Sequence, residues 1–385
     1  MRPIIAVHAG AGSFSESKIK PTLSLVKRAC REAKSNGTGH FCSSDREGKE
    51  ALRLDSVNLV TNAIEVLEGS PLTNAGYGSN LTIAETVECD AGLMDGSRLQ
   101  FASVGAVSQI RNPIQLAKNL LRYQLDTEDS ALVPPMTLVG AGAENFAKKL
   151  DNKAILLGKS DDMISEQSHK AYQKALEQVS GPRNKKKHSD SVQLDTVGAV
   201  AVGSNHSIAA GCSSGGLVLK QPGRIGQAAV YGAGCWAESG PRFSIGASTS
   251  GCGEHIVRAN LARAVCEDII NYPQFQDNAS NHSDYEYPCA TDSGIMLPQA
   301  LESSFRRRFL QCNALRKRNC NKNYVLAGIL VVLIDHHLNE AEIAWCHNTN
   351  QMCIAYTNNF GKTTSILSER SEVSELAVQG TGFKF

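Results

Sequence analysis

The sequence of 385 residues has no apolar run long enough to cross a bilayer, and its formal net charge is only +1. Such a balanced charge provides no overall field that attracts nucleic acid or a membrane surface. Aromatic residues are also scarce, at 6%, whereas 33 glycines and a hydrophobic content of 42% are typical of a folded globular chain with many tight turns. We therefore expect neither a membrane span nor direct binding of nucleic acid.

The 12 cysteines are spread along the chain without a CxxC pair, so we expect free thiols and no disulfide framework. The N-terminal segment lacks the plan of a signal peptide, which favours a reducing intracellular compartment. No cluster of His and Cys has the spacing of a zinc site. We therefore expect no metal and no cofactor, and we interpret Cys212, Cys235 and Cys252 as small buried groups.

Apolar periodicity predicts an α/β protein with alternating layers of helix and strand. A β-branched run at residues 3–7 predicts a strand that ends in a glycine-rich turn at residues 8–12. Apolar residues at helical spacing predict helices over residues 55–69, 113–121 and 255–270.

The middle of the chain changes abruptly in composition. Residues 151–195 are rich in Lys, Ser, Asp and Gln and predict a linker, with a weak apolar stripe that is compatible with a helix at residues 164–179. The apolar runs that follow, at residues 196–202 and 208–213, predict a β-hairpin. The β-branched run at residues 324–335 predicts a buried strand.

The boundary between linker and hairpin places one hydroxyl residue, Thr196, directly after Gln193-Leu194-Asp195. Taken alone, Thr196 is an ordinary threonine at the start of a strand, since threonine is common in strands. The rest of the sequence changes this interpretation.

Seven short segments resemble the type-2 asparaginase and taspase family of N-terminal-nucleophile hydrolases. Each is weak by itself, but they occur in the family's order along nearly the whole chain, which argues against a chance match. The segments are HAGAG at 8–12, TNAGYGSN at 73–80, ECDAGLMDG at 88–96, LDTVGAV at 194–200, SSGG at 213–216, PGRIGQAA at 222–229 and STSGCGEH at 248–255.

The resemblance implies a four-layer αββα sandwich, in which two sheets are covered by helices on both sides. It also implies that residues 1–385 form one domain whose chain cuts itself between Asp195 and Thr196. The products, residues 1–195 and 196–385, are expected to stay together as a heterodimer or as a dimer of such heterodimers.

The implied chemistry has a physical reason that depends on this cleavage. A threonine hydroxyl is a weak nucleophile until a base removes its proton, and a free α-amino group with a pKa near roughly 8 is a suitable base. Cleavage therefore makes Thr196 both nucleophile and base. In the uncut chain the same nitrogen is an amide, so self-cleavage needs another base, for which the Asp195 carboxylate is a candidate.

The resemblance assigns roles to further residues around the nucleophile. Ser214 matches a hydroxyl residue that orients it, although a turn-capping serine is the alternative. Ser250 and Gly251 match oxyanion donors, because their turn can aim a hydroxyl and a backbone N–H at a developing negative oxygen. Asn74 and Gly10 match positions that line the site, and either can be purely structural.

Two positions bear on the substrate. Arg224 matches a residue that pairs with a substrate carboxylate, which suits a planar guanidinium. Asparaginases carry Asp at the position of Gln227, where it holds the free α-ammonium of a small substrate, whereas a neutral amide suits a residue inside a polypeptide. Together with Cys252, where asparaginases usually have Thr, this is similar to the taspase branch. Gly92 replaces the family's usual Ser and is interpreted as tolerated because it is smaller.

The function implied is that of a threonine endopeptidase that cleaves itself and then cleaves nuclear proteins after Asp in Gln-apolar-Asp-Gly-like sites. The implied substrates are the trithorax and mixed-lineage-leukaemia methyltransferases and the large subunit of the general factor TFIIA. Gln193-Leu194-Asp195 resembles the pattern before the cut in these substrates.

Several alternatives stay open at this point. Within enzymes the alternative is an isoaspartyl peptidase or L-asparaginase, and outside enzymes it is a catalytically silent nuclear binding protein. The basic run at residues 183–188 is either a solvated loop or a nuclear import signal, so we expect a location in the nucleus and the cytoplasm.

Overall fold

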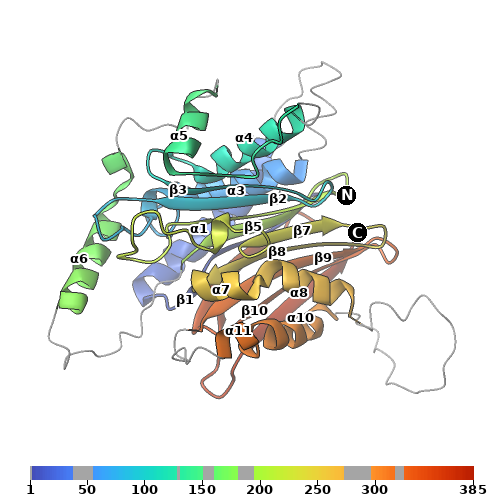
Figure 1. Ribbon diagram of the computed structural model, residues 1–385. Helices are drawn as coiled ribbons and strands as arrows, with labels where there is room; N and C mark the ends of the chain where they lie inside the picture. Colours follow the sequence, from blue (N-terminus) through green and yellow to red (C-terminus); the bar gives the residue numbers. More distant parts are fainter. Residues whose placement is uncertain are drawn as a thin grey trace.

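The computed structural model describes residues 2–37, 55–127, 131–150, 160–180, 195–272, 296–316 and 325–385. Two β-sheets lie face to face with helices on their outer sides, which makes four layers (Figure 1). Within the described ranges, no helix is long and apolar enough to span a bilayer.

The larger sheet has eight strands in the order β12-β11-β1-β5-β6-β2-β3-β4, and all neighbours are antiparallel except β3 and β4. Its strands are β1 (Ile4–Gly12), β2 (Cys89–Asp95), β3 (Gln100–Val107), β4 (Thr137–Val139), β5 (Val197–Val202), β6 (Ile208–Ser214), β11 (Gln351–Thr357) and β12 (Thr363–Glu369).

The smaller sheet has five antiparallel strands in the order β13-β10-β9-β8-β7. Its strands are β7 (Cys235–Ser239), β8 (Phe243–Gly251), β9 (Ala327–Asp335), β10 (Glu340–His347) and β13 (Ala377–Lys384).

Helices cover the outer face of each sheet. The eight-stranded sheet packs against α1 (Glu16–Gly37), α3 (Asp55–Glu68), α4 (Pro113–Asp126) and α5 (Gly140–Lys148). The five-stranded sheet packs against α8 (Leu261–Ile270) and α10 (Leu297–Phe305). The remaining elements are α6 (Glu166–Ser180), α7 (Gly253–Ala259), α11 (Asn313–Arg316), the 3₁₀ turns η1 (Gly76–Gly78), η3 (Ser160–Met163) and η5 (Gln227–Ala229), and the π-turn η7 (Arg306–Leu310).

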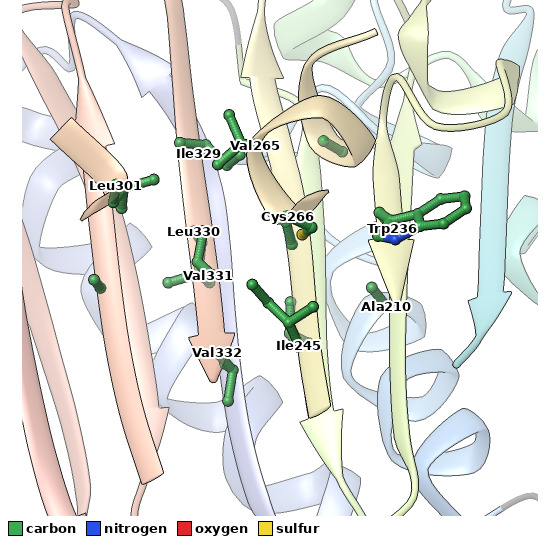
Figure 2. Close-up of a cluster of buried hydrophobic side chains, with 14 of the residues drawn as sticks. Ala210, Trp236, Ile245, Val265, Cys266, Leu301, Ile329, Leu330, Val331 and Val332 are labelled. Carbon is green, nitrogen blue, oxygen red and sulfur yellow. The ribbon is translucent and has the colours of Figure 1, made fainter. Parts of the chain in front are cut away.

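Successive side chains of the central strands point to opposite faces of their sheet, and both faces are covered. Along β5, Val197 and Ala199 belong to the core beneath the helices α1, α3 and α4, whereas Val200 and Val202 belong to the core between the sheets. In β9 the successive side chains of Ile329 and Leu330 are both fully buried, because one face meets the other sheet and the opposite face meets helices. Figure 2 shows apolar side chains around β8, β9 and α8 that belong to the same cluster as Val200 and Val202.

Most of the predicted elements are confirmed. The hairpin is β5 and β6, the helix near residues 113–121 is α4, and the weak stripe inside the linker is the helix α6. The first helix prediction corresponds to α3 and the buried strand to β9.

Two predictions about local structure are wrong. The glycine-rich segment at residues 8–12 is not a turn, because β1 continues through it with a register shift between His8 and Ala11. The helix predicted over residues 255–270 is divided into α7 and α8 by Asn260, whose φ of 44° is left-handed and therefore ends the first helix. The basic run at residues 183–188 lies outside the described residues.

Candidate active site

The β-hairpin brings two hydroxyl groups together. Val197 pairs with Ser213 in the register of β5 and β6, so the preceding Thr196 lies opposite Ser214. Thr196 Oγ1 is 2.9 Å from Ser214 Oγ, and both residues are almost fully buried. The Gly216 N–H donates a 3.0 Å hydrogen bond to the Ser214 oxygen, which orients that hydroxyl. The predicted pairing of these two residues is thus present in the geometry.

Gln227 approaches the same hydroxyl from the η5 turn. Its side-chain Nε2 donates a 3.2 Å hydrogen bond to Thr196 Oγ1, and the residue is buried. A small pocket opens beside Thr196. The described residues that line this pocket are Asn74, Thr196, Ser214, Gly216, Leu217, Arg224, Gln227, Gly251 and Gly253.

Asn74 connects this pocket wall to the predicted cleavage point. Its side-chain amide donates a 2.8 Å hydrogen bond to the Gly216 carbonyl, and its oxygen accepts a 2.9 Å bond from the Asn80 N–H. The Asn74 backbone N–H donates to the Asp195 carbonyl at 3.1 Å. Asn74 therefore lies at the site and also holds together the turn at Gly216 and the residue before Thr196.

Gly10 lies behind the cleavage point and does not line the pocket. Its φ is +110°, and a Cβ at this position would lie 2.5 Å from the Asp195 Cα. Only glycine combines this backbone conformation with such a close approach. Gly10 therefore allows the chain around Asp195 to pack directly against β1.

The Asp195 side chain is buried at this junction. Burial raises the pKa of this carboxyl to about 7, and the positive charge of Lys18 opposes the shift. Its Oδ1 is one of the buried side-chain oxygens for which the described residues offer no hydrogen-bond partner. A carboxyl whose pKa is near neutrality can exist in both protonation states at neutral pH, as a proton-transferring group requires.

The two predicted oxyanion donors are placed differently. Gly251 lines the pocket, at the end of β8. Ser250 is fully buried, and its oxygen accepts a 3.0 Å hydrogen bond from the Ala11 N–H of β1. Because successive residues of a strand face opposite sides, Ser250 points toward the other sheet. The structure brings Gly251 to the pocket wall but not Ser250, whose oxyanion role stays a prediction.

Arg224 lines the pocket, but its guanidinium has a partner within the chain. Nε and Nη2 donate hydrogen bonds of 2.8 Å and 2.7 Å to the two carboxylate oxygens of Glu254. Burial raises the pKa of Glu254, but the hydrogen bonds and charge of Arg224 outweigh it, so the net shift is downward. This pair was not predicted from the sequence, because the two residues lie in separate segments.

Other supporting polar residues were also missed. His8 Nε2 lies 2.9 Å from Ser248 Oγ and joins the two sheets, and burial lowers the pKa of His8 to about 4, against a smaller raising effect of the Thr196 backbone. Asp90 accepts hydrogen bonds from the Gly226 N–H at 2.7 Å and the Ala106 N–H at 2.9 Å. A carboxylate within an apolar, glycine-rich strand is a sequence signal that could have marked Asp90.

The interpretation of Gly92 as merely tolerated is corrected by the structure. A Cβ at this position would lie 2.2 Å from the Ala228 carbonyl oxygen of η5 and 3.1 Å from the Phe101 ring. In this chain the absence of a side chain lets η5, which carries Gln227, pack directly on β2. The interpretation of three cysteines as buried holds in part, since Cys212 and Cys235 are buried free thiols but Cys252 is partly exposed.

The fold and the Thr196 pocket define a hydrolase of the N-terminal-nucleophile class. The chain belongs to the asparaginase family (Asparaginase_2), whose sequence profile matches residues 1–295.

Three relatives illustrate this membership. An isoaspartyl peptidase/L-asparaginase of Xenopus laevis is 35% identical over 266 residues, which cover 69% of this chain and 75% of the relative. A plant-type L-asparaginase of Pyrobaculum calidifontis is 36% identical over 262 residues, or 67% and 77% of the two chains. An isoaspartyl peptidase of Escherichia coli is 32% identical over 269 residues, or 68% and 75%.

Proposed function

We propose that this chain is a threonine endopeptidase that cleaves itself between Asp195 and Thr196 and then cleaves other proteins after aspartate. The observation that carries the proposal is the composition of the pocket wall. None of the nine described residues that line it is acidic, and the side chain of this wall that donates a hydrogen bond to Thr196 Oγ1 is the neutral Gln227. Among these lining residues a free amino acid would find no carboxylate for its α-ammonium group, and the Glu254 carboxylate beside the pocket is already paired with Arg224. A residue within a polypeptide has no such group to satisfy.

The geometry supports a reaction in two stages. In the uncut chain, Thr196 Oγ1 attacks the carbonyl carbon of Asp195 and the peptide bond between the two residues breaks, which frees the α-amino group of Thr196 and leaves an ester on Oγ1. Water then hydrolyses this ester, which releases the new carboxyl end at Asp195 and the Thr196 hydroxyl. For this stage we assign the Asp195 carboxyl, whose burial raises its pKa to about 7, as the base that accepts the proton. In each later turnover the α-amino group takes the proton from Oγ1, and Ser214 holds the hydroxyl in position.

The second stage also needs a stabiliser for the negative oxygen that forms on the substrate carbonyl. The Gly251 backbone lies in the pocket wall at the end of β8, and we assign its N–H to this task. Its φ is +145°, and a Cβ at this position would lie 2.4 Å from the Leu326 carbonyl oxygen, so both the backbone conformation and the close approach require glycine.

A second candidate function is that of an isoaspartyl peptidase or L-asparaginase. The observation that favours it is the set of relatives, because all three of those described above carry one or both of these names. On this reading the pocket holds a small substrate in spite of the neutral Gln227.

The two functions are distinguished by substrate. We expect hydrolysis of Gln-Leu-Asp-Gly to exceed that of Gln-Leu-Asn-Gly by roughly 10 to 150-fold, since a lost charge-assisted contact to Arg224 costs about 1.5–3 kcal/mol. Gln-Leu-Glu-Gly should also fail, because its extra methylene shifts the scissile carbonyl. Ammonia release from free asparagine is measured in parallel. Rapid hydrolysis of asparagine without cleavage of the Asp peptide would establish the second candidate instead.

Gln227→Asp is the matched variant for this comparison. It should weaken cleavage of the Asp peptide, because a negative charge then lies near the substrate carboxylate. It should raise activity on free asparagine, because that charge can pair with the α-ammonium group. An unchanged ratio of the two activities would show that Gln227 does not select the substrate.

We also propose nuclear protein substrates, a heterodimer or dimer of heterodimers after the cut, and import directed by the basic run at residues 183–188. Exchanging Lys185, Lys186 and Lys187 for Ala should reduce the nuclear fraction of a tagged protein and leave peptide cleavage in vitro unchanged. An unaltered nuclear signal would return the run to a solvated loop.

A further inference from the structure

A bidentate ion pair stands at the edge of the pocket. Arg224 uses the edge of its guanidinium that carries Nε and Nη2 to bind both oxygens of Glu254. The Arg224 side chain is 15% exposed and the Glu254 side chain 40%, so the arginine is the inner member of the pair. Glu254 is the second residue of the helix α7, which begins two residues after Gly251, the last residue of β8.

The pair leaves a different edge of the guanidinium toward the pocket. A Cβ on Gly216 would lie 2.7 Å from Arg224 Nη1, and Gly216 is part of the pocket wall. A Cβ on Gly226 would lie 2.9 Å from the same nitrogen. In the described part of the chain, no hydrogen bond to Nη1 accompanies those of Nε and Nη2 to Glu254. Gly216 and Gly226 thus leave room for Nη1 beside the pocket.

We propose that Glu254 is a positioning residue for substrate specificity: it fixes the plane of the Arg224 guanidinium so that the edge with Nη1 is presented to the carboxylate of the substrate. This inference rests on the proposed function, because it takes Arg224 as the group that binds that carboxylate. Glu254 does not touch the substrate itself.

The physical reason is the geometry of the guanidinium. Its donors form a rigid planar fork, so fixing one edge by two short bonds also fixes the direction of the other edge. An arginine side chain without such a partner has several rotatable bonds, and restricting them on binding carries an entropic cost. Glu254 removes much of this cost before the substrate arrives.

The test uses two substitutions of Glu254 and the peptides Gln-Leu-Asp-Gly and Gln-Leu-Asn-Gly. Glu254→Asp keeps the charge but withdraws the carboxylate by one methylene, so it isolates geometry from charge. We expect the KM for the Asp peptide to rise about 10-fold, with kcat within about 3-fold of the unmodified protein. Glu254→Gln can still accept one hydrogen bond from Nε, and we expect a smaller rise.

The ratio of kcat/KM for the two peptides provides the second measurement. Glu254 acts through the contact between Arg224 and a carboxylate, which the Asn peptide lacks. Glu254→Asp should therefore lower the ratio of kcat/KM for the Asp peptide to that for the Asn peptide by about the same factor as it raises the KM for the Asp peptide. KM does not depend on the fraction of enzyme that has matured, so incomplete self-cleavage of a variant does not obscure the result. A general disturbance of the pocket would instead reduce activity on both peptides equally.

Glu267→Asp is the control, because it shortens a comparable carboxylate outside the pocket. Glu267 accepts a 2.7 Å hydrogen bond from Arg263 Nε and is 44% exposed, close to the 40% of Glu254. This variant should leave both KM values unchanged. An unchanged or lower KM for the Asp peptide in both Glu254 variants would overturn the inference and identify Glu254 as inert or as a competitor of the substrate. Failure of the unmodified protein to cleave either peptide would contradict the proposed function instead.

Discussion

Ser213 and Ser214 are neighbours on β6, but their hydroxyl groups lie in different surroundings on opposite faces of the larger sheet. Ser214 faces the pocket and lies 2.9 Å from Thr196 Oγ1. Ser213 faces the helices and donates a 2.6 Å hydrogen bond to the carboxyl group of Glu68 on α3.

Three hydrogen-bond donors surround the carboxyl group on the helix side. Glu68 also accepts hydrogen bonds from the Ile114 N–H at 3.0 Å and the Asn112 side-chain amide at 3.4 Å. Burial raises the pKa of Glu68 to about 8, while these hydrogen bonds oppose the shift. A strongly shifted pKa often marks a functional group, but Glu68 is fully buried and does not line the pocket.

The comparison shows that access to the pocket distinguishes the roles of the two serine hydroxyl groups. On the helix side, Glu68 and Ser213 are fully buried, and the hydrogen bond between them ties β6 to α3. On the pocket side, the hydroxyl of Ser214 serves a nucleophile that a substrate can reach. The predictions below separate a catalytic face of the strand from a structural face.

The largest effect is expected at Thr196. Thr196→Ala removes the attacking oxygen, so we expect no self-cleavage and no peptide hydrolysis. Thr196→Ser keeps a hydroxyl and an amine but loses the methyl that restricts the rotamer, so slower processing and partial activity are expected. Gel electrophoresis should show two fragments for the unmodified chain, with threonine as the new N-terminus of one. A Thr196→Ala chain that still divides between residues 195 and 196 would remove the basis of the proposed function.

The strands around Thr196 could be predicted from the sequence only in part. The runs that form β5 and β6 were recognisable because each is a short apolar segment beside a polar one. The segment at residues 8–12 was misread as a turn because glycine is most often a turn residue. Here Gly10 serves a close approach of two backbone segments, which depends on tertiary packing that no local pattern reveals.

The residues of the site were likewise predicted only where a local motif marks them. Thr196, Ser214 and Gln227 were predicted from motifs, and Thr196 Oγ1 lies within hydrogen-bond distance of the other two side chains. The partners Glu68 and Glu254 were missed, because each is an ordinary acidic residue in a helix and becomes special only through a contact far away in sequence. The hydrogen bond from the Ala11 N–H to Ser250 was likewise not predicted, because it joins β1 and β8, which belong to different sheets.

The next largest effect compares the two serines directly. Ser214→Ala should lower kcat about 10 to 100-fold, because the hydrogen bond that orients Thr196 is lost while the fold keeps its core. Ser213→Ala should lower the free energy of unfolding by about 1–3 kcal/mol, because the buried Glu68 loses a donor, and should leave kcat within about 3-fold. Peptide kinetics on the matured fraction and urea unfolding of the uncut Thr196→Ala chain measure the two quantities. Equal losses of kcat in both variants would contradict the division between the faces.

The smallest effect concerns the dependence of stability on pH. The pKa of Glu68 is raised to about 8 in the folded protein, against about 4.3 in an unfolded chain, so the folded state binds more protons between these values. The free energy of unfolding should therefore fall as pH rises through this range, and the contribution of Glu68 should level off above about pH 8. Asp195, with a pKa of about 7, acts in the same direction, whereas His8 and His347, with pKa values lowered to about 4, act in the opposite direction below about pH 6.5.

Glu68→Gln isolates the contribution of this carboxyl group. Glutamine resembles the protonated acid in shape and does not ionise, so the variant should lose less stability than its parent between pH 6.5 and pH 8.5. Urea unfolding in the uncut Thr196→Ala background keeps the chain in one piece, which removes the concentration dependence that two fragments would introduce. The parent and the variant share Asp195, His8 and His347, so the difference between their pH profiles reports Glu68 alone. Parallel profiles would mean that Glu68 is ionised in the folded protein, and the helix side of β6 would then hold a buried charge instead of a neutral hydrogen-bonded cluster.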